Sequence, residues 1–231
     1  METPVQCPLL KSYCEIMSHP IVVKKKSESK FFFAVENTSR IPRKFSVAFY
    51  GDKKVGKTSI LQRTTTGCYH KKYEPTISDI FEVEVQKQDC SKTHLTVYDT
   101  SGLHPFPAMM RVTLSHCDAC VIVFSLTSEK TLLFAENKIL EIQKIKGKTF
   151  PCILVGNQSD SSNREVIFEK ALRLAVKYSC SYLEVSAELN KNINELFSSV
   201  LKKINNYERY FKNSNAFQKQ RYKMMSDLTL L

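Results

Sequence analysis

From residue 45 onward, the hydrophobic positions follow two alternating patterns. Short apolar segments of strand length are followed by longer segments with the three- or four-residue spacing of amphipathic helices. The expected strands are residues 45–50, 80–88, 94–99, 119–126, 151–156 and 181–186. The expected helices are residues 57–66, a short irregular one near 105–115, 129–146, 165–179 and 193–211.

The lengths of the connections predict how these strands pair. Only residues 80–88 and 94–99 are close enough in the sequence to form a hairpin, so the other strands require crossover connections. We therefore expect a three-layer α/β fold, in which a six-stranded, mostly parallel sheet with one antiparallel strand is flanked by about five helices.

The same pattern divides the chain into three parts. Residues 1–44 show no sustained period and are expected to be an N-terminal extension, mostly disordered. Residues 45–205 are the expected domain, and residues 206–231 are a basic C-terminal tail. The composition of the 231 residues, 42% hydrophobic and 25% charged, is typical of a soluble globular protein.

Charge and terminal motifs bear on membrane association. The net charge is +11, and part of the excess positive charge lies at the two ends of the chain. These basic residues either attract an anionic membrane surface or form solvated tails without a partner. The chain shows no signal-peptide pattern and no C-terminal prenylation motif. We expect a cytoplasmic protein with at most weak electrostatic association with the inner face of the plasma membrane, and no nucleic-acid partner.

The eight cysteines do not suggest a disulfide framework. Several lie inside apolar segments, where cysteine behaves as a small hydrophobic residue, and this usage suits a reducing cytosol. Cys117 and Cys120 form a C-x-x-C pair without a second pair at zinc-site spacing. A redox or metal role for this pair is the less favoured alternative.

One motif between the first strand and the first helix carries specific chemistry. It fits the pattern G-x-x-x-x-G-K-S/T, in which backbone N–H groups and a helix N-terminus surround a phosphate. Within it, Lys57 is expected to reach the β- and γ-phosphates and Thr58 to bind Mg²⁺. An ordinary glycine-rich turn is the alternative. The motif comprises Gly51, Asp52, Lys53, Lys54, Val55, Gly56, Lys57 and Thr58.

Three further polar segments follow expected strands, and parallel strands of this kind place ligands at their carboxyl ends. Each segment alone is weak evidence, because similar sequences occur in ordinary turns and loops. In this order and at these strand ends, together with the phosphate-binding motif, they predict a nucleotide site. The segments are Asp99-Thr100-Ser101-Gly102, Asn157-Gln158-Ser159-Asp160 and Ser186-Ala187-Glu188.

With these motifs in place, residues 45–205 resemble a Ras-type small GTPase, and they are most similar to the Di-Ras subgroup. The resemblance implies the P-loop NTPase fold, binding of GTP or GDP with Mg²⁺, slow hydrolysis, and two switch segments that respond to the γ-phosphate. The segments that carry the closer similarity are residues 99–109, 123–127, 143–147 and 164–166.

The resemblance implies a role for individual residues at the phosphate end. Thr58, Thr76 and Asp99 would hold Mg²⁺, with Thr76 also sensing the γ-phosphate. Lys57, Thr76 and Gly102 are the catalytic candidates, and Leu103 stands at the usual glutamine position. Further nucleotide-binding candidates in these segments are Ser59, Tyr73, Thr100 and Ser101.

At the base end, the resemblance implies that Tyr69 packs on the guanine ring and that Asp160 accepts hydrogen bonds from its N1–H and amino groups. Asn157 would brace the base and the phosphate loop. The backbones of Ser186 and Ala187 would approach the guanine oxygen. Gln158, Ser159 and Glu188 complete the candidate base site.

Several residues depart from the family pattern. Leu103 cannot hydrogen-bond an attacking water, so hydrolysis should be very slow. Lys53 and Lys54 replace glycines, and Lys53 should obstruct an arginine finger or, alternatively, supply positive charge itself. Gln158 and Glu188 stand where the family commonly has lysine. Either these two changes only reduce affinity, or they cause partial loss of nucleotide binding.

The expected partners are proteins. Effectors would bind through the switch segment 73–81, and an exchange factor is a second candidate. Ser78 and Phe81 stand where Ras relatives commonly have Glu and Tyr, so classical effectors are not assumed. Classical GTPase-activating partners are doubtful because of Lys53. The leading hypothesis is a GTP-binding switch with impaired hydrolysis; the alternatives are a pseudo-GTPase scaffold and, less favoured, a P-loop ATPase or kinase.

Overall fold

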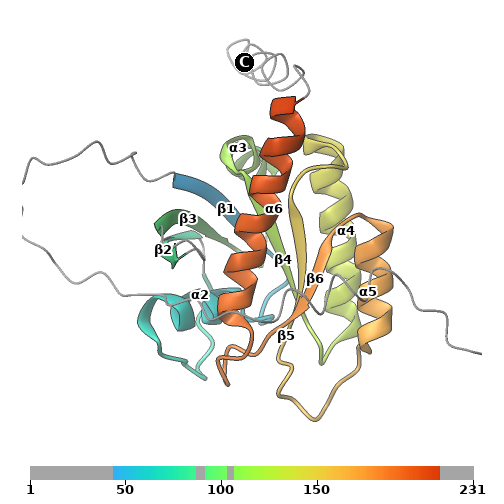
Figure 1. Ribbon diagram of the computed structural model, residues 1–231. Coiled ribbons are helices and arrows are strands. Elements are labelled where there is room, and N and C mark those ends of the chain that lie inside the picture. The colour runs from blue at the N-terminus through green and yellow to red at the C-terminus, as the bar shows by residue number, and fades with distance from the viewer. Residues whose placement is uncertain (1–43, 77, 87–91, 103–106, 214–231) are drawn as a thin grey trace, which may run out of the picture.

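The protein is an α/β sandwich of three layers, as the sequence pattern predicts (Figure 1). The computed structural model describes residues 44–76, 78–86, 92–102 and 107–213. Its strands are β1 (Lys44–Tyr50), β2 (Ser78–Gln86), β3 (Lys92–Thr100), β4 (Ala119–Ser125), β5 (Cys152–Asn157) and β6 (Ser181–Glu184). Its helices are α2 (Lys57–Thr66), α3 (Pro107–His116), α4 (Glu129–Lys146), α5 (Phe168–Lys177) and α6 (Ile193–Asn213).

The described strands form one six-stranded sheet in the order β2-β3-β1-β4-β5-β6. Only β2 is antiparallel, and it pairs with β3 along its full length. The central strands β4 and β5 are buried at every position. This burial explains their continuous apolar sequences, because helices cover both faces of a parallel sheet.

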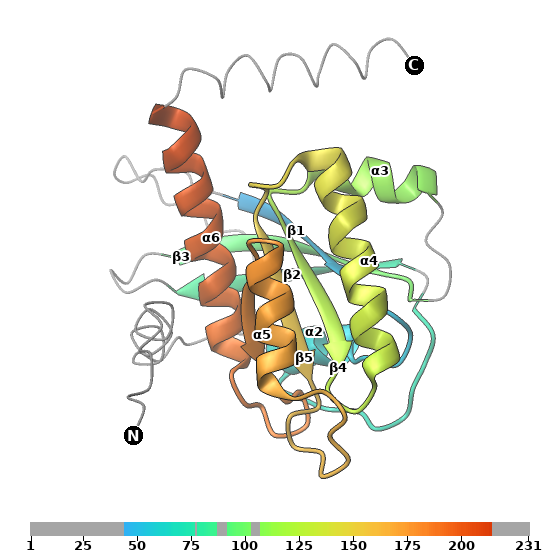
Figure 2. The same ribbon diagram turned by 90° about the vertical axis from the view of Figure 1, so that its right-hand side faces the viewer.

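The helices divide between the two faces (Figures 1 and 2). Helices α2 and α6 pack on one face around Ile60, Leu61 and Phe197. Helices α3, α4 and α5 pack on the other face around Leu114 and Ile139. The parallel strands all end at the same edge, and the loops that follow β1, β3, β5 and β6 therefore meet there.

Several predicted boundaries differ from the structure, and hydrogen bonds outside the elements explain two of the differences. The helix expected at 165–179 begins at Phe168, because the N–H groups of Glu165 and Val166 both donate to the carbonyl oxygen of Leu126. The strand expected at 181–186 ends at Glu184, because Ser186 turns to pair with Lys191. Helix α6 continues through Asn213.

Most of the expected extension, residues 1–43, and most of the expected tail, residues 214–231, lie outside the described residues, as do Ile77 and Leu103. Among the helices that the structure describes, none has the length and apolar character needed to cross a membrane.

Candidate functional site

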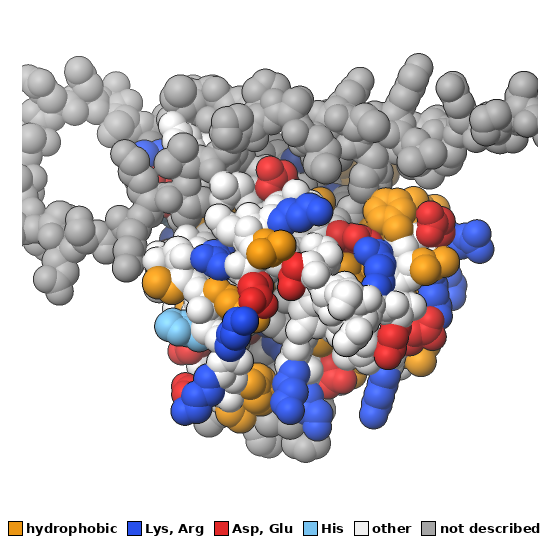
Figure 3. All heavy atoms as spheres, turned by 90° about the horizontal axis from the view of Figure 1, so that it is seen from below, with side chains coloured by type: hydrophobic (Ala, Val, Ile, Leu, Met, Phe, Trp, Pro, Cys, Tyr) orange, Lys and Arg blue, Asp and Glu red, His pale blue; other side chains and the backbone are white. Residues whose placement is uncertain are grey.

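A pocket of about 1180 Å³ lies at the edge of the sheet where the parallel strands end. Seen from this end, basic and acidic side chains are interspersed over the surface (Figure 3). The predicted site residues that line the pocket come from all four strand ends and from the segment before β2. They are Lys53, Lys54, Gly56, Lys57, Thr58, Ser59, Tyr69, Tyr73, Thr76, Thr100, Gly102, Asn157, Gln158, Asp160, Ala187 and Glu188.

Other predicted residues lie behind the pocket wall and do not line it: Gly51, Asp52, Val55, Asp99, Ser101, Ser159 and Ser186. Some of these support residues that do. Asp99 is fully buried and contacts Thr58, and the buried Ser186 accepts a backbone bond from Lys191 at the turn that precedes α6. The structure thus brings the predicted segments into one site, apart from Leu103, which lies outside the described residues.

Two glycines allow the pocket walls to approach each other. Gly56 has φ of 90°, and a Cβ atom there would lie 2.2 Å from the Asn157 side-chain nitrogen. At Gly102, a Cβ atom would lie 2.6 Å from the backbone nitrogen of Lys53. A side chain at either position would therefore separate the loop at 51–58 from the segments that follow β5 and β3.

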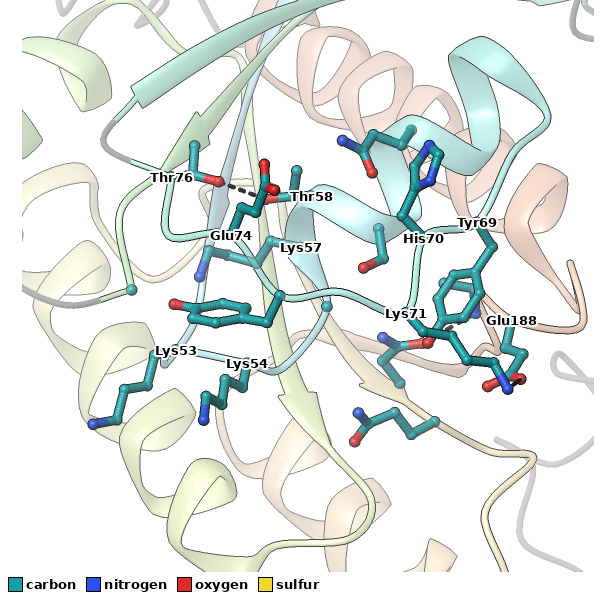
Figure 4. A pocket seen from close by; sticks show the side chains of 18 of the residues that line it. Lys53, Lys54, Lys57, Thr58, Tyr69, His70, Lys71, Glu74, Thr76 and Glu188 are labelled. Carbon is teal, nitrogen blue, oxygen red and sulfur yellow. Dashed lines mark hydrogen bonds and ion pairs between the residues drawn. The ribbon is translucent and has the colours of Figure 1, made fainter.

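Lys57 is buried at the centre of the loop. Its ammonium donates to the carbonyl oxygens of Gly51 and Asp52, each at 3.0 Å. Burial lowers the pKa of Lys57, and the carboxylates of Asp99 and Asp52 oppose this effect. The side chain extends along the pocket floor beside Thr58 (Figure 4), where its charge is available to an anionic ligand.

Three oxygen-bearing side chains meet next to this lysine. The Thr58 hydroxyl donates to Asp99 Oδ2 at 2.5 Å and lies 2.9 Å from the Thr76 hydroxyl (Figure 4). Burial raises the pKa of the Asp99 carboxyl to about 6, although the Thr58 hydrogen bond and the Lys57 charge favour its ionised form. The cluster joins α2, β3 and the segment before β2.

This cluster fits a magnesium ion. Asp99 Oδ1 is buried and has no hydrogen-bond partner among the described residues. Mg²⁺ prefers oxygen ligands and usually binds through one or two carboxylates together with phosphates and water. A site of this kind needs no cluster of three or more acidic, histidine or cysteine side chains, and the described part of the chain contains none.

Asn157 connects the two ends of the pocket from a buried position. Its Nδ2 donates to the carbonyl oxygen of Val55 at 2.9 Å, and its Oδ1 accepts a hydrogen bond from the N–H of Ala187 at 3.3 Å. One side chain therefore holds the loop after β1 and the loop after β6 in a fixed relation.

Gln158 adopts a left-handed backbone conformation, with φ of 66°. Its side-chain oxygen accepts hydrogen bonds from the hydroxyls of Ser125 and Thr127, at the end of β4. The side chain therefore has an anchor that does not depend on charge. This arrangement offers a structural substitute for the lysine commonly found at this position in the family.

A second group of contacts holds the rim of the pocket around Tyr69 in place. Arg63 of α2 donates to the carbonyl oxygens of Ala187, at 2.8 Å, and of Glu188, and its guanidinium lies 5.9 Å from the centre of the Tyr69 ring. Lys71 forms an ion pair of 3.0 Å with Glu188 (Figure 4). Burial, followed by the charges of Glu188 and Asp160, raises the pKa of Tyr69.

The two unusual lysines of the loop are exposed. In Figure 4, the side chains of Lys53 and Lys54 point away from Lys57 and Thr58. Lys54 has φ of 61°, and its ammonium lies 5.5 Å from the centre of the Tyr73 ring. The backbone of Lys53, rather than its side chain, forms the close contact with Gly102.

Sequence reasoning missed Arg63, Thr127 and Lys71. Nothing in the sequence near Arg63 indicates that its guanidinium reaches the loop after β6, because that contact spans 124 positions. For Lys71 the sequence did contain an indication, because this residue is two positions after Tyr69 and its charge is opposite to that of Glu188.

A glycine-containing loop between a strand and a helix, with a lysine on its inner side and an oxygen cluster beside it, defines a P-loop nucleotide-binding protein. Comparison with known proteins gives the family. The Ras family model matches residues 46–206. The chain belongs to the Ras family of small GTP-binding proteins.

Individual relatives agree. The chain is 39% identical over 160 residues to the GTP-binding protein Di-Ras2 of Mus musculus, an alignment that covers 68% of this chain and 80% of that protein. It is 37% identical over 159 residues to Di-Ras1 of Homo sapiens, with the same coverage of both chains. It is 36% identical over 174 residues to the GTP-binding protein Rhes of Mus musculus, an alignment that covers 69% of this chain and 65% of Rhes.

Proposed function

We propose that this Ras-family protein is a guanine-nucleotide-dependent switch that hydrolyses GTP slowly and recruits partner proteins while GTP is bound. The observation that carries the proposal is the link through Asn157, which joins the phosphate loop to the loop that would contact the base. A pocket built in this way holds both ends of a nucleotide at once.

The base end supports guanine rather than adenine. Asp160 lines the pocket near Tyr69 and is exposed. Its carboxylate can accept two hydrogen bonds from the N1–H and amino groups of guanine, and adenine lacks this pair of donors. The Arg63 contacts with the carbonyl groups of Ala187 and Glu188 hold the facing loop in place.

The phosphate end supports a nucleotide bound with magnesium. Lys57 and the backbone of the loop would bind the phosphates, and Thr58, Thr76 and Asp99 would hold Mg²⁺. A bound Mg²⁺ neutralises charge on the phosphate oxygens. Thr76 belongs to the segment before β2, so its contact with Thr58 couples the position of that segment to the contents of the pocket.

The residue type at position 103 supports slow GTP hydrolysis. Leu103 stands where the family places the glutamine that orients the attacking water, and a leucine side chain has no hydrogen-bonding group. Hydrolysis of this kind depends mainly on positioning and on charge stabilisation. We therefore propose that the GTP-bound state is long-lived, and that Lys53 further limits activation by a partner's arginine.

The proposed partner surface is the segment 73–81 together with the exposed edge of β2. Strand β2 is the outermost strand beside β3, and Ser78, Asp79 and Ile80 are exposed on it. Its outer edge can pair with a partner's strand. The basic termini contribute at most weak electrostatic attraction to a membrane, so we propose a cytoplasmic protein with transient association at the inner face of the plasma membrane.

The experiment that tests this proposal is a titration of the nucleotide-free full-length chain with a fluorescent GDP analogue in the presence of Mg²⁺. We expect saturable binding that GTP and GDP reverse and that ATP does not. Single-turnover hydrolysis of GTP should then be slow. Equal competition by ATP would favour an ATPase, and a complete lack of binding would favour the pseudo-GTPase scaffold.

A further inference from the structure

The parallel strands β4, β5 and β6 carry a row of cysteines where they begin, at the end of the sheet opposite to the pocket. Cys120 is the register partner of Cys152 on the neighbouring strand. Cys180 directly precedes Ser181, which is the partner of Ile153. Cys180 therefore occupies the position beside Cys152, one step before the β5–β6 pairing begins.

The spacing of this pair suits a disulfide. Adjacent strands lie about 4.8 Å apart, and disulfides bridge Cα separations of about 4.4–6.8 Å. Both side chains lie on the same face of the sheet, where Cys180 packs against the buried cluster that contains Cys152. The two thiols are also close enough for each to shift the pKa of the other.

The two thiols differ in reactivity. Cys180 is partly exposed, whereas Cys152 is buried. The neighbouring Cys152 thiol and the charge of Lys203 lower the pKa of Cys180, against the effect of burial. Lys203 is held nearby because its Nζ donates to the carbonyl oxygen of Ser179 at 3.0 Å. The neighbouring Cys180 thiol and burial raise the pKa of Cys152.

We propose that Cys180 and Cys152 form a peroxide-responsive dithiol, with Cys180 as the attacking thiol and Cys152 as the resolving thiol. Peroxide reaches a partly exposed thiolate first, and this arrangement of a reactive thiol next to a resolving one is typical of redox sensors. A transient disulfide of this kind is compatible with a reducing compartment.

The chemistry is balanced with hydrogen peroxide as the oxidant. The Cys180 thiolate attacks one oxygen, the O–O bond breaks, and the leaving hydroxide takes a proton to become water, which leaves Cys180 as a sulfenic acid. The Cys152 thiol then attacks the sulfenic sulfur and loses its proton, and a second water leaves. Two thiols are oxidised to one disulfide and one peroxide is reduced to two waters.

Two further cysteines, Cys120 in β4 and Cys117 just before it, are less suited to this reaction. Cys120 is fully buried, and burial raises the pKa of its thiol. Cys117 is also buried, and burial raises its pKa to about 12. Neither has the partly exposed thiol that a soluble oxidant would reach first. This difference gives the test its internal control.

The test uses the full-length chain in which four of the eight cysteines (Cys7, Cys14, Cys68 and Cys90) are replaced by serine, so that Cys117, Cys120, Cys152 and Cys180 remain. The reduced protein is exposed to hydrogen peroxide, unfolded, alkylated with iodoacetamide, digested and analysed by mass spectrometry without reduction. We expect a peptide linked through Cys152 and Cys180, with the loss of two alkylatable thiols per chain, reversed by dithiothreitol. Cys117 and Cys120 should still be fully alkylated by iodoacetamide after the peroxide treatment.

Two variants sharpen the result. In Cys152→Ala, the linked peptide should disappear and dimedone should capture a sulfenic acid on Cys180. In the matched control Cys120→Ala, the linked peptide should persist. The proposal is overturned if Cys152 stays fully alkylatable in the parent protein after peroxide treatment, or if Cys180 instead links two chains. The parent protein alone decides this, so a misfolded variant does not obscure the answer.

Discussion

Asn157 and Val55 are joined by a hydrogen bond of 2.9 Å between the side-chain amide and the backbone carbonyl oxygen, so the phosphate loop is tied to the strand end that precedes Asp160. Asn157→Ala removes this bond and the one from Ala187, and leaves buried polar groups unpaired. We expect the free energy of unfolding to fall by about 2–3 kcal/mol and nucleotide release to be roughly tenfold faster.

Urea denaturation and release of a fluorescent GDP analogue measure these two effects. Asn206→Ala, at an exposed position of α6, is the matched control and should behave like the parent protein. Unchanged release from Asn157→Ala would show that the two loops are held together by other contacts.

Removal of Mg²⁺ should change the rate of GDP release, and this effect should depend on Thr58. We expect EDTA to accelerate GDP release from the parent protein by at least about tenfold, because the ion links protein oxygens to the phosphates. In Thr58→Ala, release should already be fast and EDTA should add little. Thr66→Ala, on an exposed turn of the same helix, controls for the loss of a threonine and should keep the full EDTA response. A normal EDTA response in Thr58→Ala would contradict this role.

The ion pair between Lys71 and Glu188 predicts a charge-reversal rescue. Glu188→Lys places two positive charges together, and Lys71→Glu places two negative charges together, so each should speed GDP release by roughly two- to fivefold. The double variant restores an opposite pair and should return the rate toward that of the parent. Both side chains lie at the surface, so the effects should shrink at high salt. Additive single effects would show that the pair does not hold the rim.

Leu103→Gln should raise the intrinsic rate of GTP hydrolysis. One recovered hydrogen bond to the attacking water corresponds to about tenfold in rate. The measurement is single-turnover hydrolysis with Leu103→Asn as control, since asparagine has the same group on a shorter stem. If the rate of Leu103→Gln does not change, Lys53→Gly tests whether the lysine dominates instead.

Glu136 gives a prediction for the pH dependence of stability. Hydrogen bonds from Lys177, at 3.0 Å, and from Tyr178, at 2.8 Å, lower the pKa of this carboxyl in the folded protein. Because the pKa is lower in the folded protein, the ionised carboxylate adds stability at pH values above the unfolded-state pKa of about 4.5. This contribution is lost as the pH falls through the lower, folded-state pKa. Glu136→Gln should therefore lower the urea midpoint slightly at pH 7 and not at pH 3. The exposed Glu169→Gln is the control, and an equal loss at both pH values would contradict the assignment.

The sequence predicted the parts of the fold that depend on local signals. The bounds of α2 and α4 match the expected ranges, and each helix is followed by a glycine with positive φ, Gly67 and Gly147. The start of α5 was wrong because Glu165 and Val166 bond to Leu126, which is remote in the sequence. No periodicity of the local residues contains that information.

The same limit applies to the site. Residue types and strand ends were sufficient to predict which segments meet at the pocket, since the topology brings the carboxyl ends of parallel strands together. The supports around those residues were not predictable, because Arg63, Ser125 and Thr127 act through contacts far along the chain. The anchoring of Gln158 by two hydroxyls shows how a departure from the family pattern can keep a structural role.

The central claim is that this pocket binds guanine nucleotide. Its most direct test is to purify the full-length chain in the presence of Mg²⁺, denature it, and identify the released nucleotide by chromatography against GDP, GTP, ADP and ATP standards. We predict close to one guanine nucleotide per chain, with a large share as GTP because hydrolysis is slow. A protein that releases no guanine nucleotide and does not bind the fluorescent GDP analogue would contradict the account.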